Sequence, residues 1–172
     1  MAFPYKRVLL VGCGGAGKST MARAMGERFS LPVVHLDRLW WLPGWEHISR
    51  EEFDEKLSIE LKKPEWIIEG NYSRTFAMRL KSADFCILLD LDTAACLKSA
   101  YARWETYRGR SRPDMTEGCE ERVDPEFEQW ILDFKRDVFP GMLEILNEGG
   151  VEHRIFTSRE EAYAWLDSFE RV

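Results

Sequence analysis

Residues 6–29 read KRVLLVGCGGAGKSTMARAMGERF, and this stretch decides the fold. Its first part, residues 8–11, is a continuous run of apolar β-forming residues, which is typical of a short strand buried on both faces. The next part, GCGGAGKS at 12–19, fits G-x-x-x-x-G-K-S at every fixed position. From Ser19 to Phe29, apolar residues recur at the spacing of one helix face. This order of strand, glycine-rich loop and helix is typical of a phosphate-binding loop.

The chemistry of phosphate binding explains each part of this motif. Glycines let the backbone approach a polyphosphate and turn its N–H groups inward, and the helix adds free N–H groups and a positive dipole end. Lys18 is placed to reach the β- and γ-phosphates, and Ser19 to bind Mg²⁺. We therefore expect ATP and Mg²⁺ as ligands. The expected nucleotide-binding residues are Gly12, Gly14, Gly15, Ala16, Gly17, Lys18, Ser19 and Thr20. The alternative is a glycine-rich turn that fits the pattern by chance, which the flanking strand and helix disfavour.

Length and composition limit the classes of protein to consider. The chain has 172 residues, with 24 basic against 30 acidic side chains and a net charge of −6. We expect one globular domain over 1–172 and no direct binding to DNA, which relies on many lysines and arginines. No stretch is long and apolar enough to span a membrane. The four cysteines show no C-x-x-C pair, which predicts reduced thiols in a cytoplasmic protein.

Further apolar runs alternate with amphipathic stretches along the chain. The expected strands after the first are 33–36, 66–69, 85–89 and 153–156. The expected helices are at about 49–63 and 94–107, then from 124 to 149 with a break at Pro140, and from 158 onward. Alternation of this kind predicts an α/β fold with a parallel sheet and right-handed crossovers.

Polar residues follow the second and third expected strands, where ligands bind in open α/β sheets. Asp37 is placed either to meet an acceptor hydroxyl or Mg²⁺, or to cap the next turn. Glu69 is a candidate to hold Mg²⁺ through water, so that Ser19 and Glu69 are the expected metal residues. The candidate substrate-binding residues are Asp37, Trp41, Glu69, Asn71 and Arg74. For Trp41 and the neighbouring tryptophans, the alternative is simple packing.

An arginine cluster at Arg103 and in the segment RGRSRPD, residues 108–114, stands out in this acidic chain. One interpretation is a solvated charged face. The other is a lid over about 108–122 whose Arg108, Arg110 and Arg112 close over the phosphates, stabilise the charge of the transferred group and exclude water.

Three stretches, together with the loop, resemble a known family. They are HLDRLWWLPGW at 35–45, EGNYSRT at 69–75 and RGRSRPDMTEGCEERVDPEFEQWI at 108–131. They are similar to the small P-loop kinases described as DNA topology modulation proteins, or FlaR-related proteins. The resemblance implies an adenylate-kinase-like or shikimate-kinase-like P-loop fold, with three α/β/α layers, a five-stranded parallel sheet of order 2-3-1-4-5 and an arginine-rich lid.

Two details of that resemblance concern the acceptor. Shikimate and gluconate kinases place an aspartate just after the second strand, where it meets the acceptor hydroxyl, and Asp37 matches this position. Adenylate kinases carry Asp-Gly-Phe-Pro-Arg after the third strand, and residues 69–74 match it only at the carboxylate and at an arginine.

The sequence thus predicts an ATP- and Mg²⁺-dependent phosphotransferase, similar to nucleoside and nucleotide kinases, with a nucleotide donor and a small acceptor, acting as a monomer or a homodimer. A hydroxyl-bearing molecule is one candidate for the acceptor. Lys18, Asp37, Arg108, Arg110 and Arg112 are the expected catalytic residues. The alternative is a nucleotide-binding regulator in which ATP orders the lid without useful transfer. A GTPase switch is disfavoured because the chain has no N-K-x-D motif.

Overall fold

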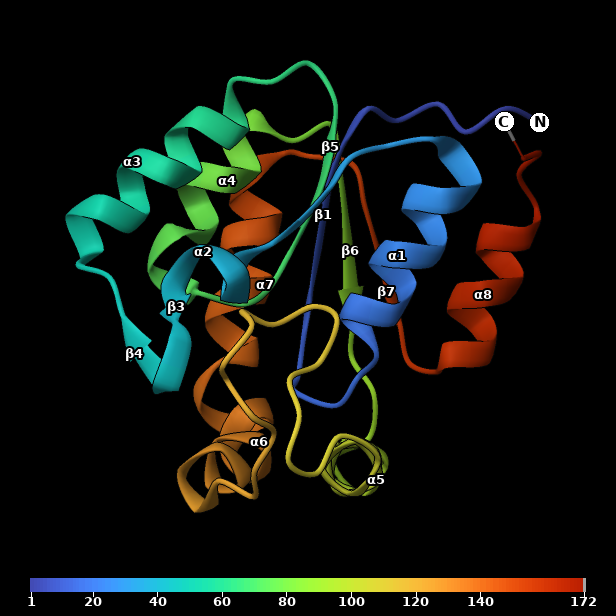
Figure 1. Ribbon diagram of the computed structural model, residues 1–172. Helices are drawn as coiled ribbons and strands as arrows, with labels where there is room; N and C mark the ends of the chain where they lie inside the picture. Colours follow the sequence, from blue (N-terminus) through green and yellow to red (C-terminus); the bar gives the residue numbers. More distant parts are fainter. Residues whose placement is uncertain (172) are drawn as a thin grey trace.

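The computed structural model describes residues 1–171, and its centre is a parallel sheet (Figure 1). The five strands are β1 (Arg7–Gly12), β2 (Val33–His35), β5 (Trp66–Glu69), β6 (Phe85–Leu89) and β7 (His153–Phe156). They lie in the order β2-β5-β1-β6-β7, and every neighbouring pair is parallel. All residues of β5 and β6 are buried, as continuous apolar runs in a sheet covered on both faces must be.

This arrangement agrees with the strands expected from the sequence, although the labels differ. Counted along the chain without the hairpin, the five strands have the order 2-3-1-4-5. The labels differ because two further strands, β3 (Trp41–Leu42) and β4 (Glu46–His47), lie between β2 and β5 in the sequence. They form a separate antiparallel hairpin around the short 3₁₀ helix η1 (Pro43–Trp45). We call residues 41–47 the tryptophan hairpin; the sequence analysis did not predict it.

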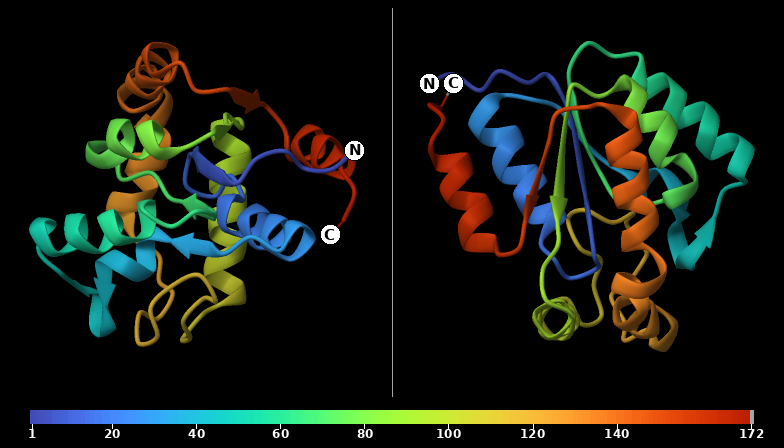
Figure 2. Two further views of the ribbon diagram at one scale, coloured as in Figure 1. Left: turned by 90° about the horizontal axis from the view of Figure 1, so that it is seen from above. Right: turned by 180° about the vertical axis from the view of Figure 1, so that it is seen from behind.

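Helices cover both faces of the sheet, which gives three layers (Figure 2). On one face lie α1 (Lys18–Phe29) and α8 (Arg159–Asp167), and on the other lie α3 (Arg50–Leu61), α4 (Phe76–Ser82) and α7 (Phe139–Gly149). Below the carboxyl ends of the strands lie α5 (Thr93–Thr106) and α6 (Pro125–Asp137), whereas α2 (Leu36–Trp40) directly follows β2 and lies next to α3. A last short element, η2 (Ser73–Thr75), leads into α4. No helix within residues 1–171 combines the length and apolar character that crossing a membrane needs.

The helix boundaries follow capping residues that can be seen in the sequence. Ser49, Asp92, Asp124 and Ser158 each accept a hydrogen bond from a backbone N–H of the first turn that they precede. Pro140 stands in the first turn of α7, so that the expected long helix is split into α6 and α7.

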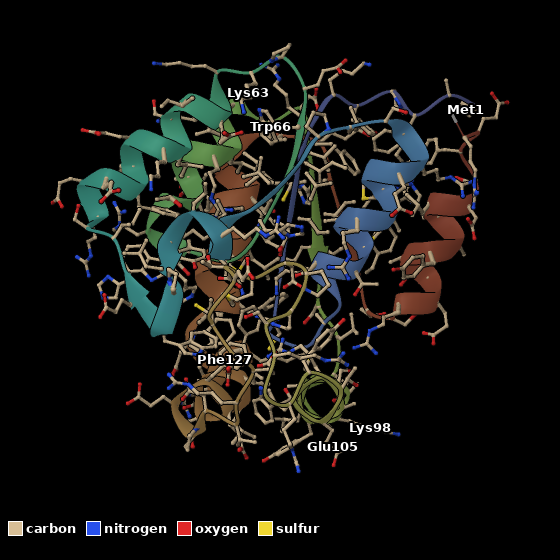
Figure 3. The ribbon with its side chains drawn as sticks, in the orientation of Figure 1. Met1, Lys63, Trp66, Lys98, Glu105 and Phe127 are labelled. Carbon is tan, nitrogen blue, oxygen red and sulfur yellow. The ribbon has the colours of Figure 1, made fainter. Side chains whose placement is uncertain are left out.

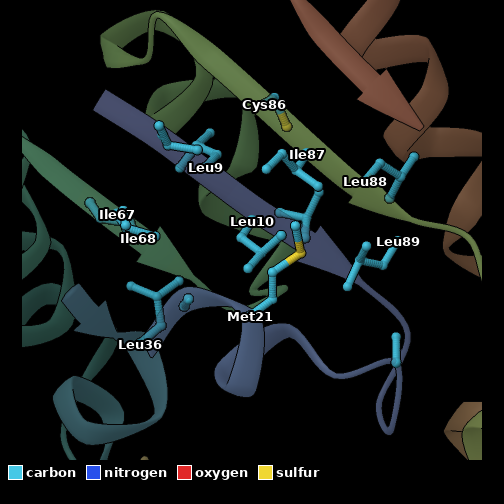
Figure 4. Packing of buried hydrophobic residues seen from close by; sticks show 14 of the residues in the cluster. Leu9, Leu10, Met21, Leu36, Ile67, Ile68, Cys86, Ile87, Leu88 and Leu89 are labelled. Carbon is cyan, nitrogen blue, oxygen red and sulfur yellow. The ribbon is translucent and has the colours of Figure 1, made fainter. Parts of the chain in front are cut away.

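The core is built around β1, with side chains of the neighbouring strands and of α1 packed against it (Figure 4). Leu9 and Leu10 from β1 and Met21 from α1 are at most 1% exposed. Burial of this apolar surface stabilises the fold by roughly 25 cal/mol per Å². The loop between β1 and α1 is therefore connected to two well-packed elements.

One charged side chain, Arg79 of α4, is completely buried beside this core. It donates hydrogen bonds to the carbonyl oxygens of Gly70, Asn71 and Tyr72, and to the hydroxyl of Thr75. Buried polar groups need such partners, so Arg79 fixes the path of the loop that follows β5.

Candidate active site

The glycine-rich loop connects β1 to α1 at the carboxyl edge of the sheet. Its tightest approach is at Gly15, where a Cβ atom would lie 2.1 Å from the carbonyl oxygen of Cys96 in α5, at a φ of +76°. Gly17, with a φ of +99°, starts α1 in the left-handed region. Both positions therefore require glycine. The backbone N–H of Gly12 donates to Oδ1 of Asn71 over 3.1 Å, which ties the loop to the segment after β5.

Lys18 is the first residue of α1, and its ammonium group folds back over the loop. Its Nζ donates a 2.8 Å hydrogen bond to the carbonyl oxygen of Cys13. Burial lowers the pKa of Lys18, while the carboxylates of Glu69 and Asp37 act in the opposite direction. An anion bound in the loop would further favour the charged ammonium form.

Ser19, Glu69 and His35 form a hydrogen-bonded chain beside the loop. The hydroxyl of Ser19 donates to Oε1 of Glu69 over 3.0 Å, and Nδ1 of His35 lies 2.7 Å from the same oxygen. His35 and Glu69 are paired across β2 and β5, so the sheet register brings them together. Both side chains are buried, at 7% and 4% exposure.

This group of oxygens fits a magnesium ion that is bound together with phosphates. Mg²⁺ prefers oxygen ligands and usually keeps several waters, so one hydroxyl and one nearby carboxylate are a sufficient protein contribution. Within residues 1–171, no cluster of three or more histidine, cysteine and acidic side chains forms a metal cage. The donor set of Ser19 and Glu69 therefore suits Mg²⁺ held largely by phosphate and water.

Asp37, in the first turn of α2, lies across the same cavity from the loop. Tyr72 donates a 2.7 Å hydrogen bond from its hydroxyl to Oδ1 of Asp37, and Arg112 Nη2 lies 3.9 Å from Oδ2. The pKa of Asp37 is raised by burial and by the nearby charge of Glu69, and Tyr72 and Arg112 oppose that shift. A carboxylate with a raised pKa is a better proton acceptor near neutral pH.

Arg112 occupies the centre of an ion-pair network at the mouth of the cavity. Its guanidinium lies 2.8 Å from Glu121 and 3.3 Å from Asp114. Arg103 of α5 lies 3.2 Å from the same Glu121, and Arg23 of α1 lies 3.2 Å from Asp114. The segment expected to form a lid, residues 108–122, is thus anchored to two helices by buried charges; we call it the lid segment.

Two cavities lie side by side here. The larger, of about 610 Å³, is bounded by the phosphate-binding loop, Asp37, Glu69 and the arginines Arg23, Arg103, Arg112 and Arg159. The smaller, of about 300 Å³, lies under the tryptophan hairpin. The two share Asp37, Tyr72, Arg103, Arg112 and Phe127 as walls. Phe127 projects from α6 toward the loop, where a Cβ atom on Gly14 would meet its ring (Figure 3).

Most of the residues expected from the sequence meet at these cavities. The larger is lined by Gly14, Gly15, Gly17, Lys18, Ser19, Thr20, Asp37, Glu69, Asn71 and Arg112. Gly12 and Ala16 belong to the backbone of the loop, and Trp41 lines the smaller cavity.

Three expected residues lie apart from the cavities. Arg74 forms a 2.6 Å ion pair with Asp54 of α3 and is 47% exposed. Arg108 and Arg110 are exposed, and Arg110 donates to the carbonyl oxygen of Thr106 and lies over the ring of Tyr107. Of the three lid arginines, the structure brings only Arg112 to the larger cavity.

Several residues of the site were missed by the sequence analysis. Arg159, the first residue of α8, donates to the carbonyl oxygens of Gly15 and Ala16 and to Ser99. Arg23 follows Ser19 by one helical turn, a spacing that places both on one face and could have been noticed. His35, Tyr72 and Arg159 gave no such signal, because their positions depend on how distant elements meet.

The comparisons with known proteins come from solved structures, since no protein-family model and no curated sequence gives a significant match. A shikimate kinase from Bacteroides thetaiotaomicron is similar, with a TM-score of 0.61 and 14% identity, over 96% of this chain and 96% of that one. The shikimate kinase from Acinetobacter baumannii in complex with shikimate gives 0.60 and 17%, over 95% and 92%. The chain has the shikimate-kinase fold.

A sugar kinase from Janibacter sp. HTCC2649, unliganded, gives a TM-score of 0.50 and 15% identity, over 95% of each chain. At identities this low, the likeness shows the fold alone and leaves both the activity and the acceptor open. The narrower resemblance to the DNA topology modulation proteins stays a prediction, as do the cytoplasmic location and the movement of the lid segment.

Proposed function

We propose that this protein is an ATP- and Mg²⁺-dependent phosphotransferase that acts on a hydroxyl group of a small acceptor. The observation that carries the proposal is that Asp37 faces the phosphate-binding loop across one cavity, with Lys18, Ser19 and Glu69 on its other side. A loop for a phosphoryl donor and a carboxylate for an acceptor are the two parts that such a transfer needs.

The residues then divide between donor and acceptor. Backbone N–H groups of residues 12–19 and the ammonium of Lys18 would hold the donor phosphates, and Ser19 would bind Mg²⁺ directly, with Glu69 acting through a water molecule. The ion supplies charge neutralisation on the β- and γ-phosphates. Arg112, at the mouth of the cavity, is placed to stabilise the charge of the transferred group. Arg108 and Arg110 would join it on closure of the lid segment, which stays a prediction.

Asp37 would orient the acceptor hydroxyl and take its proton as the transfer proceeds. A bond forms between the acceptor oxygen and the γ-phosphorus, and the bond from that phosphorus to the β–γ bridging oxygen breaks. The products are ADP and a phosphomonoester of the acceptor. Tyr72 would keep the Asp37 carboxylate aimed at the cavity through its hydrogen bond.

The proposal is tested by ³¹P NMR of the protein with Mg²⁺-ATP and pooled hydroxylated metabolites and nucleosides. We expect a new phosphomonoester signal that Lys18→Ala abolishes while circular dichroism shows an intact fold. Lys98→Ala, at an exposed position on α5, is the matched control and should keep the signal. Bound ATP without any phosphorylated acceptor would reject the proposal and favour a nucleotide-binding regulator.

A further inference from the structure

The smaller cavity differs in character from the larger one. Of its thirteen lining residues, six are charged and six are aromatic: Trp40, Trp41, Trp45, Trp104, Tyr72 and Phe127. Trp41 and Trp45 stand edge to face, with ring centroids 5.3 Å apart, and both keep part of their surface exposed. Aromatic side chains of this kind bind flat rings by stacking.

Two of the three arginines around this cavity are held in ion pairs. Arg112 lies within ion-pair distance of Glu121 and Asp114, and Arg103 within ion-pair distance of Glu121. The third, Arg122, lies 5.0 Å over the ring of Trp45. The acidic walls Asp37, Glu121 and Asp124 match these three arginines in number. The walls therefore carry no net charge that would attract a carboxylate or a phosphate of the acceptor.

Glu121 adds a polar feature to the aromatic walls. Its carboxylate is 3% exposed, and its Oε2 lies 2.8 Å from Nε of Arg112 and 3.2 Å from Nε of Arg103. Glu121 therefore holds both guanidinium groups in the wall of the cavity. Asp37 lines both cavities, so it lies where the smaller cavity adjoins the larger one that contains the phosphate-binding loop.

We propose that the acceptor is a neutral, flat aromatic alcohol of the nucleoside type, whose ring lies under the tryptophan hairpin and whose hydroxyl reaches Asp37. This inference rests on the proposed function and narrows its substrate class. The ring stacks on the indoles of the hairpin. The hydroxyl carries the transfer described above, so no further reactant is needed.

Matched acceptors separate the two properties, ring and charge. Adenosine, guanosine, cytidine, thymidine and pyridoxine are compared with ribose, glucose, gluconate and shikimate, which lack an aromatic ring, and with AMP and thymidine monophosphate, which add a phosphate. Transfer from Mg²⁺-ATP is followed by ³¹P NMR and by coupled assay of ADP. We expect at least one neutral aromatic alcohol to be preferred by about tenfold or more in kcat/KM over the best member of each other group.

Variants at the hairpin test where the ring binds. Trp41→Leu should raise the KM for that alcohol by about tenfold, whereas Trp41→Phe, which keeps an aromatic face, should change it little. Trp165→Phe is the control. Trp165 belongs to α8, packs against Phe85 and Phe156, and lines neither of the two cavities. Quenching of tryptophan fluorescence by the alcohol should persist in Lys18→Ala, which separates ring binding from turnover.

Transfer to shikimate, a sugar or AMP in preference to every neutral aromatic alcohol would overturn this inference and leave the proposed function standing. Equal KM values for Trp41→Leu and Trp41→Phe would overturn the assignment of the smaller cavity as the place where the acceptor ring binds. Failure to phosphorylate any of these acceptors would reject this inference, and a failure that extended to the pooled metabolites would reject the proposed function as well.

Discussion

The hydroxyl of Tyr72 lies 2.7 Å from Oδ1 of Asp37, although the two residues are 35 positions apart in the chain. Tyr72 follows β5 with a φ of +39°, a conformation that a tyrosine rarely adopts. Arg79 holds this loop in place by donating a hydrogen bond to the carbonyl oxygen of Tyr72. The hydrogen bond from Tyr72 to Asp37 therefore joins α2 to the segment after β5.

The first prediction concerns the pH dependence that this hydrogen bond sets. Tyr72 lowers the pKa of Asp37 by stabilising its charged form, so Tyr72→Phe should raise that pKa further. A base must be deprotonated to act, and the acidic limb of the kcat/KM profile should therefore move to higher pH. The profile is measured with Mg²⁺-ATP and the best acceptor. Tyr101→Phe, on the exposed side of α5, should leave the limb in place; an unmoved limb in Tyr72→Phe would argue against Asp37 as the base.

The second prediction concerns the magnesium residues. Glu69→Gln removes the negative charge next to Ser19 and His35 while keeping the size of the side chain. The Mg²⁺ concentration that gives half-maximal rate should rise by about tenfold or more, as is usual when a supporting carboxylate is lost. Titration of Mg²⁺ at saturating ATP measures this. Glu65→Gln, an exposed partner of Lys6, is the control and should not change the titration.

The third prediction separates the arginines of the lid segment. Arg112→Gln should lower kcat by about a hundredfold, because a charge near the transferred group is lost. Arg108 and Arg110 are exposed, so Arg108→Gln and Arg110→Gln act on kcat only through the proposed closure of the lid segment, and each should lower kcat by less than Arg112→Gln does. Steady-state kinetics at saturating ATP and acceptor measure all three variants. Thermal unfolding of Arg112→Gln shows how much its ion pairs also stabilise the fold. Equal decreases in kcat in all three variants would support a lid in which all three arginines contact the phosphates.

The fourth prediction concerns stability and the buried arginine. Arg79→Met would leave the carbonyl oxygens of Gly70, Asn71 and Tyr72 without their donor. Each unsatisfied buried group costs about 1–3 kcal/mol, so the free energy of unfolding should fall by about 3 kcal/mol or more. Urea denaturation measures this change. Lys81→Met, on the exposed side of the same helix, should have little effect; a similarly small effect at Arg79 would show that the loop finds other donors.

The regions that the sequence predicted well are those governed by local pattern. The phosphate-binding loop follows from glycine and lysine spacing, and the five strands follow from short apolar runs. Asp37 and Glu69 could be placed because the carboxyl ends of parallel strands share one edge. Capping serines and aspartates fixed the starts of α3, α5, α6 and α8.

The regions that the sequence did not predict depend on contacts between distant segments. Arg108, Arg110 and Arg112 look alike in the sequence, yet only Arg112 meets buried acidic partners. Arg79 resembles any surface charge of a helix until the loop carbonyl groups around it are known. The tryptophan hairpin has strands of two residues, which are too short to leave a period in the sequence.

The hairpin is also joined to the lid segment. The backbone N–H of Gly44 donates to Gly118, Trp45 Nε1 to the carbonyl oxygen of Glu120, and the hydroxyl of Thr116 to the carbonyl oxygen of Trp41. These hydrogen bonds tie the segment that carries Arg112 to the hairpin, so that the two would move together in the proposed closure. If the protein is the proposed kinase, a water molecule would be too small to contact these walls and bring Arg112 into place. The coupling between hairpin and lid segment would then also keep the hydrolysis of ATP by water slow.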